Sequence, residues 1–451
     1  MVLPFAVSAR TQTNTQATDS SNGSETSARE QALEQRVDQL QRELEQLKSE
    51  IQAQRAAPPP PPPPVQGAAP AKPAFTSAPG VSVALHGFVS ASAFSQNKSF
   101  TFGNGQNAEF PASGENGTLS GVDIRNTRFW LDFSGAKFTG DWTGGGRIEM
   151  DFFGGFNGTG PFSQQQPTPR LRQAYLDLDN AHSGTKVRVG QQWELMFPLD
   201  NVPVSLTHIA FPLGFSSGMI GWRFPGVVVM QDLNHASSGV KWRLDLGAFE
   251  GSWSGPGDNT NYLTAGNAGF RPQLEARLRA QGQDWVAYVA GHYSRIDLRG
   301  VGGTAPTPIT PSFDSTAFEV GGIWKPGTWV FMGSAYTGRG IGQIFGDLTQ
   351  FGDIKDNGAY VQVGDHFTPN WSAYVFYGES KPNGNDVIQW LGKGSAGRLK
   401  SQQSALSLEY SAGAYDLGIE WMHAKLNSTT NGTDRHTTSG NQLSLSALYH
   451  F

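Results

Sequence analysis

From Val81 to Phe451 the chain is a succession of short segments in which apolar and polar residues alternate, separated by Gly- and Asn-rich connections. Alternation with a period of two is typical of β-strands, because successive side chains point to opposite faces of the sheet. Sixteen strands are predicted, at 81–95, 124–135, 140–153, 170–180, 184–193, 218–232, 239–250, 269–281, 284–294, 314–325, 327–339, 357–368, 370–379, 400–413, 414–425 and 439–451. The pattern therefore predicts an all-β region.

The two faces of the predicted strands differ in chemistry. At 124–133, Phe and Leu residues share a face opposite Arg128 and Asp132. The same separation recurs at 147–153, 241–246 and 273–279. A soluble sandwich also alternates, so one strand alone leaves both folds open. Acidic and basic residues together on the polar face of strand after strand favour a barrel with water inside and lipid outside.

The connections between these segments alternate in length. Short turns are predicted at 180–184, 281–284, 325–327 and 368–370. Longer polar loops are predicted at 96–123, 154–169, 194–217, 251–268, 295–313, 340–356, 380–399 and 426–438. Outer-membrane barrels have short periplasmic turns and long outer loops. The sequence thus predicts a 16-stranded antiparallel transmembrane β-barrel over 81–451, with both ends of the barrel on the periplasmic side.

The last predicted strand ends in an aromatic residue. Its apolar residues, Leu443, Leu445, Ala447, Tyr449 and Phe451, share one face. This ending resembles the signal by which the barrel-assembly machinery recognises bacterial outer-membrane barrels, and Tyr449 and Phe451 are predicted to form it. Aromatic residues near strand ends are expected in the interfacial girdles: Trp130, Trp193, Trp285, Trp371, Trp421 and Tyr415.

Three zones precede the barrel. Residues 1–26 are either a disordered start or the remnant of a signal peptide whose true translation start lies upstream. A coiled-coil helix is predicted at 27–55, because its apolar residues recur at heptad spacing. These residues are Leu33, Val37, Leu40, Leu44, Leu47 and Ile51. Self-association of this helix is favoured over packing against a neighbouring domain. Residues 56–80 contain seven consecutive prolines and predict a stiff linker, rather than a ligand for a proline-reading module.

Composition narrows the possibilities. Only 16% of residues are charged and 37% are hydrophobic, which excludes a large oily core, while 11% aromatic residues argue against disorder. A net charge of −5 gives no reason to expect nucleic acid. No run of eighteen apolar residues is present, so no transmembrane helix is expected. The absence of cysteine excludes disulfides and thiolate metal sites. The histidines are scattered and no catalytic motif occurs, so neither a metal nor a cofactor nor catalysis is expected.

The order of these motifs resembles a known family. A heptad coil, a proline linker and a barrel that begins at 83–89 are similar to the trimeric DcaP-like porins of Gram-negative bacteria. Further supporting motifs are 146–154, 170–176 and 189–193. The resemblance covers almost the whole chain after residue 27, although each motif is loose. It implies sixteen strands per subunit, a homotrimer, and diffusion of small solutes that are often anionic or of the dicarboxylate type.

The third long loop, 194–217, is unusually apolar and contains three prolines. In porins this loop folds inward and narrows the channel. Prolines stiffen the chain, so an ordinary mobile loop is disfavoured. The residues predicted at the constriction are Glu194, Phe197, Asp200, His208 and Phe211.

A ladder of basic residues is predicted along one inner wall. Its members are Arg128, Arg147, Arg170, Arg172, Lys186, Arg188, Lys241, Arg243, Arg277 and Arg279. Such a ladder sets the preferred sign of the permeating ion. The same side chains are also expected to brace the wall by pairing with Asp132, Glu149, Asp151, Asp245 and Glu275. Asp177 breaks the alternation that begins at Arg170, which suggests a β-bulge.

The sequence therefore predicts an outer-membrane porin that lets small hydrophilic solutes diffuse, with a mild preference for anions such as dicarboxylates. It is expected to be a homotrimer in contact with outer-membrane lipid, to carry its coil in the periplasm, and not to be an enzyme. The alternative is an outer-membrane anchor whose barrel holds a periplasmic coiled coil near the cell wall. A membrane-embedded esterase and a soluble sugar-binding domain are weaker alternatives.

Overall fold

The computed structural model describes residues 74–78, 80–112, 117–156, 165–234, 239–251, 271–297, 310 and 312–451. The predicted start at 1–26, the coiled coil at 27–55 and most of the linker at 56–80 lie outside these residues, so these predictions are not tested. One helix of six residues, α2 (Gly384–Gln389), is described. No helix among the described residues is long and apolar enough to cross a membrane.

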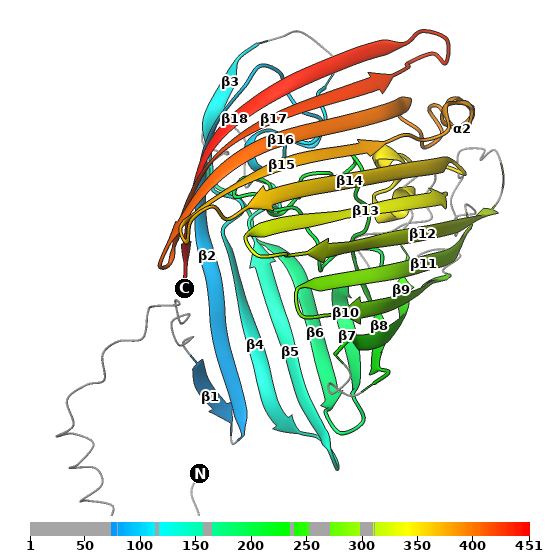
Figure 1. Ribbon diagram of the computed structural model, residues 1–451. Helices are drawn as coiled ribbons and strands as arrows, with labels where there is room; N and C mark the ends of the chain where they lie inside the picture. Colours follow the sequence, from blue (N-terminus) through cyan, green and yellow to red (C-terminus); the bar gives the residue numbers. More distant parts are fainter. Residues whose placement is uncertain are drawn as a thin grey trace, which may run out of the picture. The chain divides into compact units, whose positions relative to one another are not determined.

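The described strands form one closed antiparallel barrel (Figure 1). They are β2 (Val81–Gln96), β3 (Leu119–Asp123), β4 (Arg128–Lys137), β5 (Trp142–Asp151), β6 (Arg170–Asn180), β7 (Thr185–Trp193), β8 (Arg223–Asp232), β9 (Lys241–Glu250), β10 (Pro272–Gln281), β11 (Trp285–Asp297), β12 (Ser312–Trp324), β13 (Trp329–Arg339), β14 (Lys355–Asp365), β15 (Trp371–Ser380), β16 (Arg398–Ala412), β17 (Tyr415–Ser428) and β18 (His436–His450). Strands β3 and β4 pair with the two halves of β2, so together they occupy one position in the barrel wall. The seventeen strands β2–β18 therefore fill sixteen positions, and the predicted 16-stranded barrel is confirmed.

One further strand corrects the predicted linker. Strand β1 (Ala74–Ala78) pairs with the beginning of β2, although the sequence pattern assigned these residues to the linker that ends at residue 80. A segment of five residues is too short to show alternation, and β3 escaped prediction for the same reason. The barrel sheet thus begins before Val81.

The barrel closes where the last strand meets the first. The Phe451 N–H donates to the Gly87 carbonyl at 3.0 Å, and the Gly87 N–H donates to the Phe451 carbonyl at 3.1 Å. The Phe451 side chain is exposed on the outer face, together with Leu443 and Leu445. These pairings satisfy the backbone along the seam, so β2 and β18 leave no open edge there.

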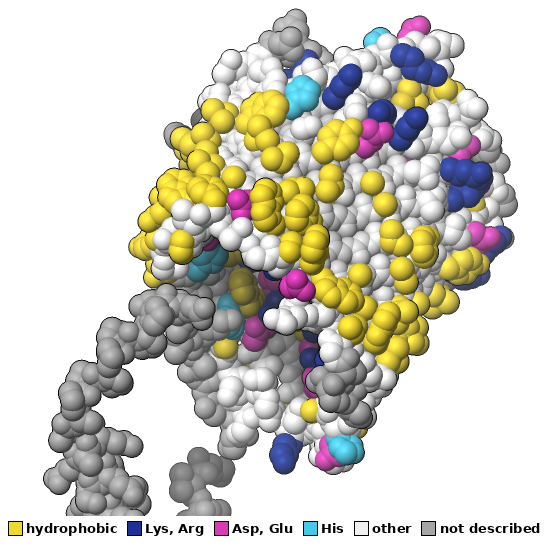
Figure 2. Space-filling view, in the orientation of Figure 1, with side chains coloured by type: hydrophobic (Ala, Val, Ile, Leu, Met, Phe, Trp, Pro, Cys, Tyr) yellow, Lys and Arg dark blue, Asp and Glu magenta, His cyan; other side chains and the backbone are white. Residues whose placement is uncertain are grey.

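The outer face of the barrel is apolar. Along β18, the exposed Leu443 and Leu445 alternate with the buried Gln442 and Ser444. Figure 2 shows hydrophobic side chains spread over the outer surface of the strands. Trp371, Trp421 and Tyr415 are exposed there, as the girdle prediction requires. A surface of this kind matches lipid, which has no groups to hydrogen-bond with polar side chains.

Two of the predicted girdle residues lie on the inner side instead, so this prediction was wrong for them. Trp130 stacks on the buried His86 at 5.5 Å between ring centroids, and Arg147 lies over its ring. Trp193 stacks on the loop residue Phe197 at 3.7 Å. Trp130 lies on the inner face that the alternation of β4 sets, beside Arg128 and Asp132. Trp193 instead has the parity of the exposed Val189 and turns inward at the end of β7, where it contacts the loop.

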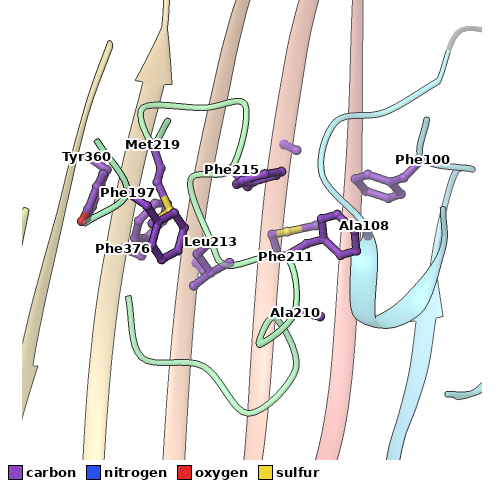
Figure 3. Packing of buried hydrophobic residues seen from close by; sticks show 13 residues of the cluster. Phe100, Ala108, Phe197, Ala210, Phe211, Leu213, Phe215, Met219, Tyr360 and Phe376 are labelled. Carbon is purple, nitrogen blue, oxygen red and sulfur yellow. The ribbon is translucent and has the colours of Figure 1, made fainter. Parts of the chain in front are cut away.

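Three loops insert buried side chains into the barrel interior. Their described residues are 97–112 with 117–118 (loop 97–118), 194–222 and 340–354. Loop residues Phe197, Leu213, Phe215 and Met219 pack with the wall residues in one buried cluster (Figure 3). From the wall this cluster takes Tyr360, Phe376, Ala405, Met422 and Ala424. The predicted alternation of ion pairs with apolar residues therefore describes β4–β7, β9 and β10. It was wrong for the inner side of β8, where Phe224 and Val228 are buried, and for that of β14–β17. The fraction of hydrophobic residues in the sequence is too low for one large core, but it is sufficient for this local hydrophobic cluster.

Candidate functional site

The inner side of β4–β7 carries consecutive ion pairs. The β4–β5 register places Arg147 opposite Asp132, and the Arg147 guanidinium donates to both Asp132 oxygens, with Nε at 2.7 Å from Oδ1. The β6–β7 register likewise joins Arg188 to Asp177, again with Nε at 2.7 Å from Oδ1. Arg188 also lies 3.8 Å from the centroid of the Tyr175 ring. The strand registers set these charged residues directly opposite each other on neighbouring strands, so their side chains meet without spanning a long distance.

A β-bulge in the β5–β6 ladder changes which residues of β6 face inward. Glu149 pairs with Gln173 and Met150 with Leu171, which leaves Arg172 as the extra residue. The bulge predicted from the position of Asp177 is thereby confirmed. Arg172 and Gln173 both reach Glu149, at 2.6 and 2.8 Å.

Four guanidinium groups gather at this bulge. Arg170 and Arg172 share Asp151, at 2.7 and 2.8 Å, and Arg172 also binds Glu149. Two more arginines lie within electrostatic range of them, Arg128 on β4 and Arg223 on β8. We call Arg128, Arg170, Arg172 and Arg223 the arginine cluster. Within it, the described residues supply two close carboxylates for four positive charges.

Arg128 and Arg223 are the two members with unused hydrogen-bonding capacity. Arg128 approaches Glu149 only at 3.9 Å, and its buried Nε and Nη2 have no hydrogen-bond partner among the described residues. The buried Nη1 of Arg223 likewise has none, and no described carboxylate lies within 4 Å of this guanidinium. Buried donors of this kind carry a desolvation cost until an acceptor reaches them.

Aromatic rings frame the cluster. The Arg223 guanidinium lies 4.3 Å from the Trp222 ring centroid and 4.6 Å from that of Trp193. Arg170 lies 5.2 Å from Phe211, which packs edge-on against Phe153. Cation–π contacts offset part of the cost of burying these charges. They also leave the guanidinium edges available to an acceptor.

Four of the remaining predicted basic residues, Lys241, Arg243, Arg277 and Arg279, lie on β9 and β10. Arg243 and Arg277 share the fully buried Asp245. Arg279 binds Asp200 of loop 194–222 with both oxygens engaged, at 2.7 and 2.8 Å. Lys241 pairs with Asp232, and Lys186 with Asp179, and both pairs are well exposed. The predicted ladder is thus divided among the arginine cluster, this group on β9 and β10, and the separate ion pairs of Arg147, Lys186 and Arg188. Its members other than Arg128 are all paired with close carboxylates.

Loop 194–222 runs across the interior and binds the far wall. The Val204 N–H donates to Gln362 on β14, and the Gly214 N–H donates to Gln403 on β16. The strongest anchor is Glu420 on β17, which accepts from Ser205 Oγ and binds His208 Nδ1, each at 2.6 Å. These contacts fix the loop inside the barrel.

The five predicted loop residues occupy different positions along this path. Phe197 lies against Trp193, His208 against Glu420, and Phe211 beside the arginine cluster. Burial opposes ionisation of Asp200, but the hydrogen bonds and charge of Arg279 hold its pKa below the ordinary value. Burial and the facing Glu275 carboxylate raise the pKa of Glu194 well above its ordinary value. The loop therefore presents chemically distinct groups to the two halves of the wall.

Sequence reasoning missed Arg223 and Glu420. By alternation Arg223 shares the face of the exposed Val227 and Val229, so the pattern places it outside the barrel. It is buried because it lies at the end of β8, beneath the rings of Trp193 and Trp222. The inward face of Glu420 was available from alternation, but its partner His208 is 212 residues away in sequence.

A closed antiparallel barrel with an apolar outer belt, an ionic inner wall and alternating short and long connections has the architecture of outer-membrane channels. Solved structures agree. The outer-membrane channel DcaP of Acinetobacter baumannii is similar to this chain with a TM-score of 0.61 and 20% identity, covering 84% of this chain and 99% of that chain. The outer-membrane protein OmpT of Vibrio cholerae matches with a TM-score of 0.51 and 13% identity, over 84% and 100% of the two chains.

OmpF of Salmonella typhi, in a complex with daunomycin, matches with a TM-score of 0.51 and 13% identity, over 82% of this chain and 98% of that chain. No protein-family model and no curated protein matches the sequence. At these identities the likeness establishes the fold, which is that of the outer-membrane channel barrels.

Proposed function

We propose that the protein is a DcaP-like outer-membrane porin through which small hydrophilic solutes diffuse, with a mild preference for anions such as dicarboxylates. The observation that carries this proposal is the arginine cluster inside a closed barrel. Its four positive charges face two close carboxylates, and Arg128 and Arg223 retain buried donors without partners. A guanidinium edge matches a carboxylate in a bidentate arrangement.

The balance of charge supports a mild rather than a strong preference. Glu149 and Asp151 neutralise half of the cluster and repel an incoming anion, while Arg128 and Arg223 attract it. A site in a channel must bind weakly enough to release the solute again. Two guanidinium groups with unpaired N–H donors suit a solute with two carboxylates, because each end finds a donor.

Loop 194–222 is the proposed constriction. It brings Phe211 and Trp222 against Arg170 and Arg223, so a solute at the arginine cluster passes between the loop and the charged wall. Glu194, Phe197, Asp200 and His208 act in this proposal by holding the loop in place. The hollow visible in Figure 2 contains basic, acidic and histidine side chains, as a polar entrance requires.

The other parts of the proposal concern assembly and location. The heptad helix would hold three subunits together in the periplasm, the apolar outer belt would contact outer-membrane lipid, and Tyr449 and Phe451 would be read by the barrel-assembly machinery. Support comes from the heptad pattern, the exposed apolar face of β18 and the resemblance to DcaP-like porins. Chemical crosslinking of the purified protein, with and without residues 1–73, tests the trimer.

The proposed anion preference is tested by reversal potentials in planar bilayers under a KCl gradient. Arg128→Gln and Arg223→Gln should each shift the reversal potential toward cations, because each removes a positive charge that is not hydrogen-bonded to a carboxylate. Arg172 is unsuitable for this test, since its fully buried guanidinium braces Glu149 and Asp151. Arg435→Gln is the matched control, because Arg435 is exposed on a loop and bonds only to backbone carbonyls. Reversal potentials equal to that of the wild type in both test variants would refute the proposed site.

A second candidate is an outer-membrane anchor that holds the periplasmic coil near the cell wall. The observation that favours it is the packed interior, since an anchor needs no open path for solutes. Removal of residues 1–73 separates the two functions. A porin conducts without this segment, whereas an anchor shows no conductance in either form and loses its association with isolated cell wall when the segment is removed.

A further inference from the structure

A second group of ionisable residues lies where loop 194–222 leaves the wall, apart from the arginine cluster. Glu194 directly follows β7, Glu275 lies on β10 and His292 on β11. One carboxylate or imidazole atom of each lies within 4.8 Å of the others, and all three side chains are buried. The β10–β11 register sets Glu275 directly opposite His292, so the wall itself fixes two of the three positions.

Neighbouring groups orient these side chains. His292 Nδ1 lies 2.9 Å from Glu275 Oε1, and its Nε2 lies 3.2 Å from Ser315 Oγ. The Leu195 N–H donates to Glu275 Oε2 at 2.7 Å. A hydrogen bond on the outer nitrogen fixes the orientation of the imidazole ring and directs the other nitrogen toward a ligand, which is the usual arrangement around a metal-binding histidine.

The group has a deficit of positive charge. Glu194 Oε2 is fully buried and has no hydrogen-bond partner among the described residues. Glu319 on β12 adds a third buried carboxylate to this electrostatic environment, and its Oε2 also lacks a partner. The nearby Arg277 is hydrogen-bonded to Asp245 instead. Buried carboxylates without a cation are costly, so either protons or a bound cation must compensate them.

We propose that Glu194, Glu275 and His292 bind a divalent transition-metal ion of the Zn²⁺ type. One imidazole nitrogen and two carboxylates suit zinc, whereas Ca²⁺ and Mg²⁺ prefer oxygen ligands alone. Three protein ligands leave a position for water. The ion would join the first residue of loop 194–222 to β10 and β11, and would thereby clamp the base of the loop to the wall.

The test uses the full-length protein purified with a tag that contains no histidine and stripped with a chelator. Isothermal titration with Zn²⁺ alone should give one tight site per chain, and Zn²⁺ should raise the unfolding temperature of the wild type. Glu194→Gln and His292→Gln should weaken this site by more than the roughly 10- to 100-fold that loss of an outer-sphere partner costs. His208→Gln is the matched control, since it removes another buried histidine that is paired with a single carboxylate.

Weak binding shared by all variants would reflect exposed histidines and would overturn the proposal, as would no binding to the wild type. If the variants fail to fold, Co²⁺ added to the wild type still decides, because a tetrahedral site gives an intense visible absorption band and an adventitious surface site does not. None of these readouts depends on conductance, so their failure leaves the proposed porin function untouched.

Discussion

Two halves of the barrel wall both have an apolar outer face, but the residues on their inner faces differ in chemistry. On β4–β7, β9 and β10 the inward residues include ion pairs, such as Arg147 with Asp132 and Arg188 with Asp177, whereas β8 between them buries Phe224 and Val228. On β14–β17 the inward positions hold Tyr360, Phe376, Ala405 and Met422, all buried. Both halves follow the period of two, because both must present apolar side chains to the outside.

The difference between the halves follows from what each one faces. The charged half keeps partial exposure at Arg147 and Arg170, whereas Arg172 and Asp245 are buried and are neutralised by ion pairs. The covered half faces loop 194–222, whose Phe215 and Met219 exclude water from Phe376. Inner-wall chemistry in this barrel is therefore set by the inserted loop as much as by the strand.

Removal of the loop should have the largest effect. Replacement of residues 200–217 by Gly-Ser-Gly eliminates the anchors to Gln362, Gln403 and Glu420, so the interior should open. We expect single-channel conductance to rise several-fold, while the barrel itself is retained because its strand ladders do not involve the loop.

Retention of the barrel is checked by its β-type circular dichroism and by its heat-dependent mobility in gel electrophoresis. A folded loop-deletion variant with unchanged conductance would show that the loop does not obstruct the solute path, and would remove the functional meaning of the comparison between the two halves.

A second prediction concerns packing on the covered half. Phe376→Ala should lower the free energy of unfolding by about 3–5 kcal/mol, because a buried aromatic side chain is lost and a cavity remains. Val375→Ala on the same strand is the control, since Val375 is 57% exposed on the outer face. Urea unfolding in lipid vesicles measures both. An equal decrease in the free energy of unfolding in the two variants would mean that the loop does not pack tightly against the covered half.

The strands were predictable because every strand of the barrel must present apolar side chains to the outside, which produces the period of two. Segments such as 170–180 match β6 residue for residue, and the β-bulge opposite Glu149 was visible as the change of parity between Arg172 and Asp177. Such features depend on neighbours within the same hairpin. The covered inner face was not predictable, because its partners come from a loop about 160 to 230 residues away in sequence, as Asn201 and Tyr360 illustrate.

The candidate site was predictable only in part, for the same reason. Alternation identified Arg128, Arg170 and Arg172, but it gave no means of separating bracing arginines from unpaired ones. Arg223 escaped because it lies where a strand ends and the loop determines its direction. Contacts between Glu194, Glu275 and His292 arise from barrel closure and loop insertion together, neither of which leaves a local motif.

The smallest expected effect is a pH dependence at the contact between two inserted loops. Glu109 of loop 97–118 is buried, and Ser216 of loop 194–222 donates to its Oε2 at 3.1 Å. Burial raises the pKa of Glu109 well above its ordinary value, although Ser216 and the charge of Arg398 act against this shift. A raised pKa in the folded state means that folding takes up a proton, so stability is fully present below the unfolded pKa and falls as pH rises through the folded value.

Glu109→Gln should therefore unfold at the same temperature as the wild type near pH 4 and at a higher one near pH 8, with a gain on the order of 1 kcal/mol. Asp200→Asn is the control of opposite sign. Because Arg279 lowers the pKa of Asp200, the stability that Asp200 contributes is present above its unfolded pKa and is lost as pH falls through the lower folded value. The Asp200→Asn variant should thus be destabilised at neutral pH, with a difference from the wild type that narrows in acid. Parallel pH profiles for Glu109→Gln and the wild type would show that the contact between the two loops stays hydrated, which would weaken the distinction between a covered and an open half of the wall.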